Sequence, residues 1–195
     1  MGLIAKIPSY SFPGAASTSA DPAARFHGPL QDFNDSFNHM HRTRQEVIDE
    51  IRNAFRRVRL GDGVGLYEGG ALDDWADDAT CRAARIRDER ELWEAIPKER
   101  LVTHHDAICF LDAEGMRFHL PAFMIAELNG AQVSCIFHLT ELSDWARGKL
   151  ALLNPQQRQA VREFLLFVLD EQDYWHHRKQ IKKSLSEYWN VEPPG

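Results

Sequence analysis

The sequence predicts an α+β domain in which a small antiparallel sheet is flanked by helices. Apolar residues recur at helical spacing at 43–58 and again at 155–172. Two stretches between these segments, 105–120 and 132–139, alternate apolar and polar residues as half-buried strands do. Helices that surround a few antiparallel strands in this way are typical of an α+β fold.

Length and composition are those of one globular domain behind an irregular N-terminal arm. The chain has 195 residues, of which 44% are hydrophobic and 27% charged. A chain of this size buries roughly 70% of the surface that its unfolded form exposes. Residues 1–40 are rich in Pro, Ser, Ala and Asn without periodic apolar spacing, which predicts the arm. Residues 41–195 are predicted to form the domain.

Cysteine usage and the absence of long apolar runs predict a cytoplasmic protein. The three cysteines lack the CxxC spacing of redox and zinc motifs. The N-terminus has no basic stretch followed by an apolar core, and no run approaches the roughly 18 apolar residues of a membrane span. We therefore expect a cytoplasmic location, no membrane contact and no cofactor.

The first helix is predicted to begin after Thr43, because Glu46 stands where it completes a capping box. It ends at the glycines of LGDGVGL, a turn rather than a phosphate loop, since it follows a helix and lacks the lysine. The stretch 71–96 alternates acidic and basic helix formers, which predicts short helices broken around 85–88. Their expected core contacts are Trp75, Leu92, Trp93 and Ile96.

The stretch FLDAEGMRFHLPAFM, residues 110–124, predicts a β-hairpin. Its four-residue turn at 112–115 ends on a glycine that is free to take a positive φ. Because side chains alternate along a strand, this register gathers apolar residues on one face of the hairpin. The other face carries Arg117 and His119.

A third strand and further helices complete the predicted domain. The strand at 132–139 adds His138 to the polar face of the sheet. A short helix is expected over 121–130, since it starts on a proline and stops at Asn-Gly. The C-terminal part is predicted to be helical from Pro155, with Asn154 as its cap.

Four blocks of the sequence resemble a known group of proteins. They are GVGLYEG, ARIRDERELW, FLDAEGMRFHLPAFMI and LNPQQRQAVREFLLFVL, in this order. From about Ile51 to Leu169, they resemble a family of uncharacterised bacterial proteins, a domain of unknown function. The resemblance implies a single bacterial cytosolic domain, and it implies no activity, cofactor or catalytic residue.

The charge of the chain is acidic and unevenly placed. The net charge of -6 argues against a nucleic-acid partner, because domains that neutralise phosphates are usually basic. The segment 61–78 contains six acidic residues and no Lys or Arg. A segment of this kind is expected to attract a basic protein.

Four aspartates of this segment, Asp73, Asp74, Asp77 and Asp78, surround Trp75. If they lay on one helix, residues four apart would share a face and repel each other. The ordinary interpretation is a helix start, where the macrodipole favours aspartates. The functional interpretation is a recognition surface that steers a basic partner and then buries the tryptophan.

The polar face of the predicted sheet offers a second candidate site. Arg117, His119 and His138 could bind an anion or transfer a proton. The ordinary interpretation is that the Arg117 stem covers Phe110 and that His119 caps the second layer of the sheet. No metal site is expected, since adjacent histidines on a strand point to opposite faces and HExxH is absent.

The sequence therefore leads to one principal function and one alternative. The principal expectation is a cytosolic protein-binding domain whose acidic surface neutralises a basic toxin, as an immunity or antitoxin protein does. It assigns no catalytic residue. The alternative is a small hydrolase or transferase that uses the face of Arg117, His119 and His138. A convex acidic ridge favours the first, and a deep cleft over the hairpin favours the second.

Overall fold

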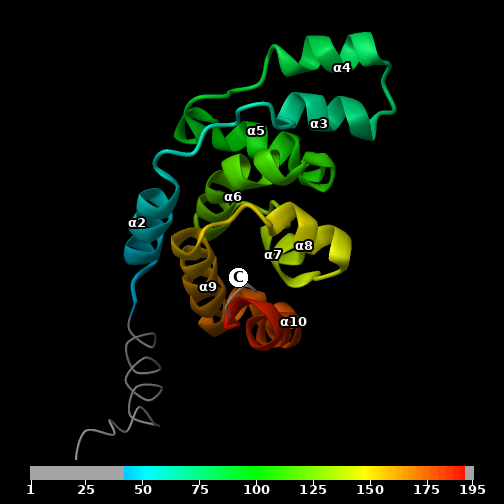
Figure 1. The fold of residues 1–195 in the computed structure, drawn as a ribbon. Coiled ribbons are helices and arrows are strands. Elements are labelled where there is room, and N and C mark those ends of the chain that lie inside the picture. Colours follow the sequence, from blue (N-terminus) through cyan, green and yellow to red (C-terminus); the bar gives the residue numbers. More distant parts are fainter. Residues whose placement is uncertain (1–41, 192–195) are drawn as a thin grey trace, which may run out of the picture.

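The structure, a computed structural model, describes residues 42–191 and contains only helices in this range (Figure 1). The expected α+β fold is wrong, because neither the hairpin at 105–120 nor the strand at 132–139 forms. The N-terminal arm expected at 1–40 lies outside the described residues. None of the helices between residues 42 and 191 is long and apolar enough to cross a membrane.

Short and long helices follow one another along the described chain. The two longest are α6 (Ala113–Leu128) and α9 (Pro155–Asp170). The other α-helices are α2 (Arg44–Phe55), α3 (Leu66–Asp73), α4 (Asp78–Arg85), α5 (Lys98–Thr103), α7 (Cys135–Thr140), α8 (Asp144–Leu150) and α10 (Arg178–Ser184). The 3-10 segments are η1 (Trp93–Ala95), η2 (His105–Phe110) and η3 (Gln172–His177), and a π-helical turn, η4 (Leu185–Trp189), ends the series.

Two helix starts confirm the capping residues expected from the sequence. At α2, Thr43 accepts from the backbone N of Glu46, whose carboxylate accepts from the Thr43 backbone N at 2.7 Å. At α9, Asn154 and Gln157 make the same reciprocal pair, with Pro155 in the first turn. These caps satisfy amides that the helices themselves leave without partners.

The expected hairpin is instead the start of the central helix, α6. Asp112 accepts from the backbone N of Gly115 at 2.7 Å, so it is an N-cap rather than a turn residue. Buried residues lie on every side of α6, and a helix that is apolar all round belongs in a core. Pro121 therefore lies inside this helix and does not start one. The predicted end is confirmed, since Asn129 is the C-cap and Gly130 has a φ of 77°.

The expected third strand is a turn followed by α7. An alternating strand would bury Phe137 and expose Ile136. The structure does the opposite, since Phe137 is 55% exposed and Ile136 is buried. Short apolar runs of this length fit a strand and a buried helical turn equally well.

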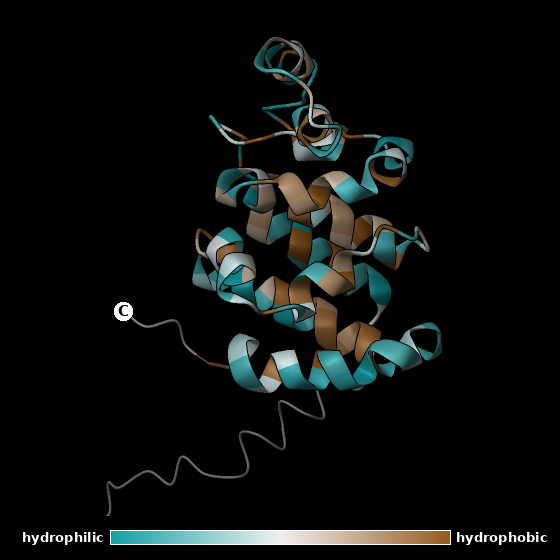
Figure 2. Cartoon of the chain, turned by 90° about the vertical axis from the view of Figure 1, so that its right-hand side faces the viewer, coloured by the Kyte–Doolittle hydropathy of each residue, from teal (hydrophilic) through white to brown (hydrophobic). Residues whose placement is uncertain are grey.

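The body of the molecule is built around α6, which contacts α2, α5, α7 and α8, while α9 packs against α2. Figure 2 shows the apolar residues concentrated in these central helices. The α3 and α4 helices pack against each other and project from one end of the body (Figure 1). We call residues 66–85 the α3–α4 projection. Its second helix, α4, buries no residue.

Phe118 and Arg117 test the position of α6 in the core. Phe118 is fully buried, so Phe118→Ala is expected to lower the free energy of unfolding by about 3–5 kcal/mol. Arg117 is only partly buried, and Arg117→Ala should cost less than about 1 kcal/mol. Urea denaturation of both variants measures the difference. Equal, small losses would contradict the placement of α6.

Candidate functional site

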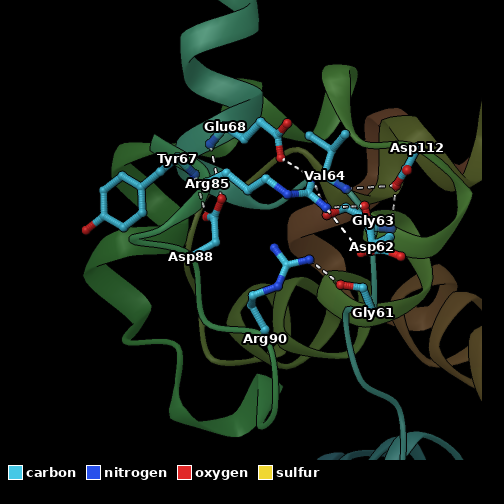
Figure 3. Close-up of polar contacts among 11 residues, drawn as sticks. Gly61, Asp62, Gly63, Val64, Tyr67, Glu68, Arg85, Asp88, Arg90 and Asp112 are labelled. Carbon is cyan, nitrogen blue, oxygen red and sulfur yellow. Dashed lines mark hydrogen bonds and ion pairs between the residues drawn. The ribbon is translucent and has the colours of Figure 1, made fainter. Parts of the chain in front are cut away.

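The α3–α4 projection rests on a glycine-rich loop at residues 61–65 (Figure 3). Asp112, the cap of α6, also accepts from the backbone N of Val64 at 3.1 Å. A Cβ atom at Gly63 would lie 2.7 Å from the Cβ of Glu114. One at Gly65 would overlap the carboxylate of Asp88. The loop therefore lies against its neighbours at distances that only glycine permits.

Asp88 caps α3 from a distant part of the sequence. The N-cap of α3 is Gly65, which has no side chain to satisfy the free amides. The Asp88 carboxylate accepts from the backbone N of Tyr67 at 2.8 Å and of Glu68 at 3.2 Å (Figure 3). Burial raises the pKa of Asp88, although both hydrogen bonds act in the opposite direction. The cap joins the first turn of α3 to the chain that leaves α4.

Two arginines, Arg85 and Arg90, donate hydrogen bonds to backbone carbonyls of the loop, and Arg85 also binds an acidic side chain of α3 (Figure 3). Arg85, the last residue of α4, donates to the Glu68 carboxylate at 2.7 Å and to the carbonyl O of Asp62 at 2.6 Å. Arg90 donates to the carbonyl O of Gly61. Glu68 and Asp62 both lie within ion-pair distance of Arg85, so these two acidic residues have a counter-charge.

Tyr67 fastens the other side of the projection to the body. The guanidinium carbon of Arg87 lies 4.0 Å from the centre of the Tyr67 ring, and that of Arg100 lies 4.8 Å from it. His104 meets the same ring edge-on at 5.1 Å. Arg100 lies on α5 and His104 is the C-cap of that helix. Their contacts with Tyr67 therefore hold α3 in a defined direction relative to the body.

The tip of the projection, residues 73–78, presents a tryptophan in a position that usually holds glycine. The backbone N of Ala76 donates to the carbonyl O of Ala71, and that of Trp75 to Leu72. These two bonds are those of a Schellman motif, whose C′ residue takes the left-handed conformation. Trp75 is that residue, with a φ of 55°, and its side chain is 94% exposed. It is not the core contact that the sequence suggested.

The four aspartates of the tip lie on two helices rather than one. Asp77 caps α4 by accepting from the backbone N of Thr80 at 2.8 Å, which lowers its pKa, and Asp78 lies in the first turn. The helix-start interpretation therefore explains the positions of Asp77 and Asp78. Asp73 and Asp74 end α3, where the helix dipole is unfavourable to a negative charge. Within residues 42–191, none of the four forms an ion pair.

The residues of the alternative site do not come together. Arg117 and His119 are two apart on α6, so they point to different sides of the helix. His119 is 1% exposed, its Nδ1 lies 2.8 Å from the carbonyl O of Gly115, and burial lowers its pKa to about 4. His138 lies on α7. The sheet face that would have joined these three residues does not exist.

His138 instead belongs to a partly buried group that the sequence did not indicate. Its Nε2 lies 3.9 Å from the Sγ of Cys109. Burial raises the pKa of the Cys109 thiol and lowers that of His138 to about 4, so both groups are neutral near pH 7. Lys149 donates to the carbonyl O of Cys109 and lies 3.7 Å from the ring centre of Trp145. Burial therefore disfavours the thiolate that a cysteine nucleophile needs.

Leu92 also differs from its expected place, since it is half exposed, whereas Trp93 and Ile96 are buried as expected. Among the residues from 42 to 191, no group of three or more His, Cys, Asp or Glu side chains could hold a metal ion.

Comparison with known protein families places most of the chain in one of them. The model of a family of unknown function, DUF6714, covers residues 43–192. No curated protein and no solved structure matches the chain.

Gly65 and Gly148 form a matched pair that tests the base of the projection. Gly65→Ala is expected to lower the free energy of unfolding by about 1–3 kcal/mol, because its Cβ would displace Asp88. Gly148 lies on α8 with open space around it, so Gly148→Ala should raise stability by up to about 1 kcal/mol. Thermal unfolding of both variants is the measurement. Similar effects of the two substitutions would contradict the described packing of the loop.

Proposed function

We propose that this chain, which belongs to the DUF6714 family of unknown function, is a protein-binding domain that contacts a basic partner through the tip of the α3–α4 projection. The observation that carries the proposal is Trp75, which is 94% exposed at a left-handed position between four aspartates without ion pairs. Neither burial nor backbone preference explains a tryptophan there. Contact with a second protein does.

The chemistry of the tip suits the two stages of association. Four uncompensated carboxylates create a local negative field, which accelerates the encounter with a basic surface. A large aromatic side chain then gains free energy when it enters a pocket, and tryptophan is enriched among the residues that dominate binding. The fixed base of the projection supports both stages, because a preorganised tip loses little entropy on binding.

The concrete form that we propose is occlusion of the active site of a basic toxin in the cytoplasm, as an immunity or antitoxin protein does. The acidic net charge of -6 and the projecting acidic tip support this form. The neutral thiol and imidazole of Cys109 and His138 and the burial of His119 provide no catalytic set that would favour an enzyme.

Charge removal at the tip tests the steering role. The variant Asp73→Asn, Asp74→Asn, Asp77→Asn and Asp78→Asn should keep its fold, because asparagine also caps helices. Affinity capture from extract of the source organism, compared with wild type, identifies the partner. Stopped-flow association with that partner should then slow by about tenfold or more, with a weaker dependence on salt.

Four exposed carboxylates elsewhere provide the control for total charge. The control variant carries Glu94→Gln, Glu99→Gln, Asp144→Asn and Asp170→Asn. It changes the net charge by the same amount and should retain most of the wild-type association rate. An equal rate loss in both variants would show that net charge, and not the tip, governs the encounter.

Trp75→Ala tests the anchoring role at the same interface. Loss of a central aromatic anchor costs about 2 kcal/mol or more of binding free energy, so dissociation should accelerate by about 30-fold. The melting temperature should not fall, because the side chain is exposed. A lower melting temperature with an unchanged dissociation rate would make Trp75 a structural residue.

A further inference from the structure

A polar cleft lies beside η3. This segment packs against α10, which lies at the opposite end of the body from the α3–α4 projection (Figure 1). It separates the α6–α7 connection from η3 and has a volume of about 480 Å³. A second cavity of about 310 Å³ adjoins it, since both are lined by Glu127, Gly130, Asp173 and Tyr174. Together they have the size of a small-molecule site.

The charges that line this cleft are mostly negative. Three carboxylates face it, those of Glu127, Glu171 and Asp173. Arg44 is the one Lys or Arg among the lining residues of the two cavities, and it lies 3.6 Å from Glu171. The carboxylates of Glu127 and Asp173, which both lie at the junction, form no ion pair with another described residue, and burial raises the pKa of Glu127. His176 and His177 also line the first cavity, and burial lowers the pKa of His177.

The junction is held in a fixed shape by the backbone around it. The Glu127 carboxylate accepts from the backbone N of Cys135 at 3.3 Å and also from that of Val133. The Tyr174 hydroxyl donates to the carbonyl O of Glu127 at 3.2 Å. These bonds connect α6, the start of α7 and η3, so the cleft keeps its shape without a ligand.

Several polar side chains of the cleft have no partner within the protein. Ser134 is the N-cap residue of α7, but its side chain makes no cap hydrogen bond. Ser134 has a φ of 57°, another left-handed position occupied by a residue other than glycine. Within the described chain, the side chains of Gln132 and Asp173 also form no hydrogen bond or ion pair. These groups are available to a ligand.

We propose that this cleft binds a small organic ammonium ion, with the charged nitrogen at the junction lined by Glu127 and Asp173. The ring of Tyr174 at the same junction adds a favourable surface for a cation. Phe167 and Leu128 in the second cavity cover the alkyl part, and the hydroxyl of Ser134 and the amide of Gln132 meet a polar end. The ammonium group can belong to a free alkylamine or to a lysine side chain.

The same lining disfavours other classes of ligand. A phosphate or carboxylate would meet three carboxylates and a single arginine that is already paired. His176 and His177 are the other basic side chains of the lining, and burial lowers the pKa of His177, which disfavours its cationic form. A metal ion would find fewer than three suitable donors together, as noted above for the described residues. A cation that is satisfied by two carboxylates and neutral acceptors fits the cleft.

Titration with 1,5-diaminopentane, followed by amide chemical shifts, tests the proposal on the full chain. We expect saturable binding in the range of about 0.1–10 mM, with shifts at Gly130, Ser134 and Tyr174. The uncharged 1,5-pentanediol should not bind. Nα-acetyl-lysine methylamide tests the second source of the ammonium group, and tighter binding of either probe identifies the source and supports the site.

Asp173→Asn and Asp170→Asn are the matched variants. Both carboxylates are exposed and lie three positions apart in sequence, but only Asp173 lines the cleft. Asp173→Asn should weaken binding by about tenfold, and Asp170→Asn should leave it unchanged. No saturable binding of either amine up to about 50 mM, or equal binding by the two variants, would overturn the proposal. The proposed protein-binding function would stand in either case, because it uses the other end of the molecule.

Discussion

The projection of the molecule depends on a cap that one part of the chain supplies to another. A helix begins with amides that need acceptors, and Gly65 provides none at the start of α3. Asp88 supplies them, and its carboxylate fits only because Gly65 has no side chain. Gly65 and Asp88 are therefore needed together, because the Asp88 carboxylate can reach the amides of α3 only where residue 65 has no side chain. This pair positions the first turn of α3, and the packing of α3 against η2 together with the Tyr67 contacts holds the rest of the helix on the body.

This arrangement concentrates stabilising contacts at the base and leaves destabilising features at the tip. The base has two carboxylate caps, the close approach of two glycines and the guanidinium contacts of Tyr67. At the tip, Trp75 occupies a left-handed position, Asp73 and Asp74 end a helix, and four negative charges lack counter-ions. Local conflicts of this kind in a consistent fold mark functional sites. The contrast between base and tip is the physical basis of the proposed interaction.

Local signals in the sequence predicted part of this structure. The capping box at Thr43, the cap at Asn154, the end of α6 at Asn129 and the acidic segment were all predicted, because each depends on residues close together in the chain. The prediction of a hairpin at 105–120 was wrong because it also relied only on residues close together in the chain. An Asp followed three residues later by Gly is compatible with both a turn and an N-cap, and burial of α6 on all sides decided between them.

The sites themselves depend on contacts that no local pattern contains. The sequence left Trp75 as either a core contact or an exposed anchor, and the structure decides for exposure because no neighbour covers the side chain beyond the turn. The cleft combines a residue of α2, the end of α6 and η3, which are distant in sequence. Asp88 and Gly65 are separated in the same way. Burial and tertiary packing, rather than periodicity, therefore position the functional candidates.

The stability of Trp75→Gly tests the central claim most directly. If Trp75 is retained for contact with a partner, glycine should raise the free energy of unfolding by about 1 kcal/mol, since it relieves the left-handed strain and removes no buried surface. Chemical denaturation of the wild-type protein and this variant, without any partner present, gives the value. A decrease of about 1 kcal/mol or more in the free energy of unfolding would mean that the tryptophan stabilises the fold, and it would contradict the account.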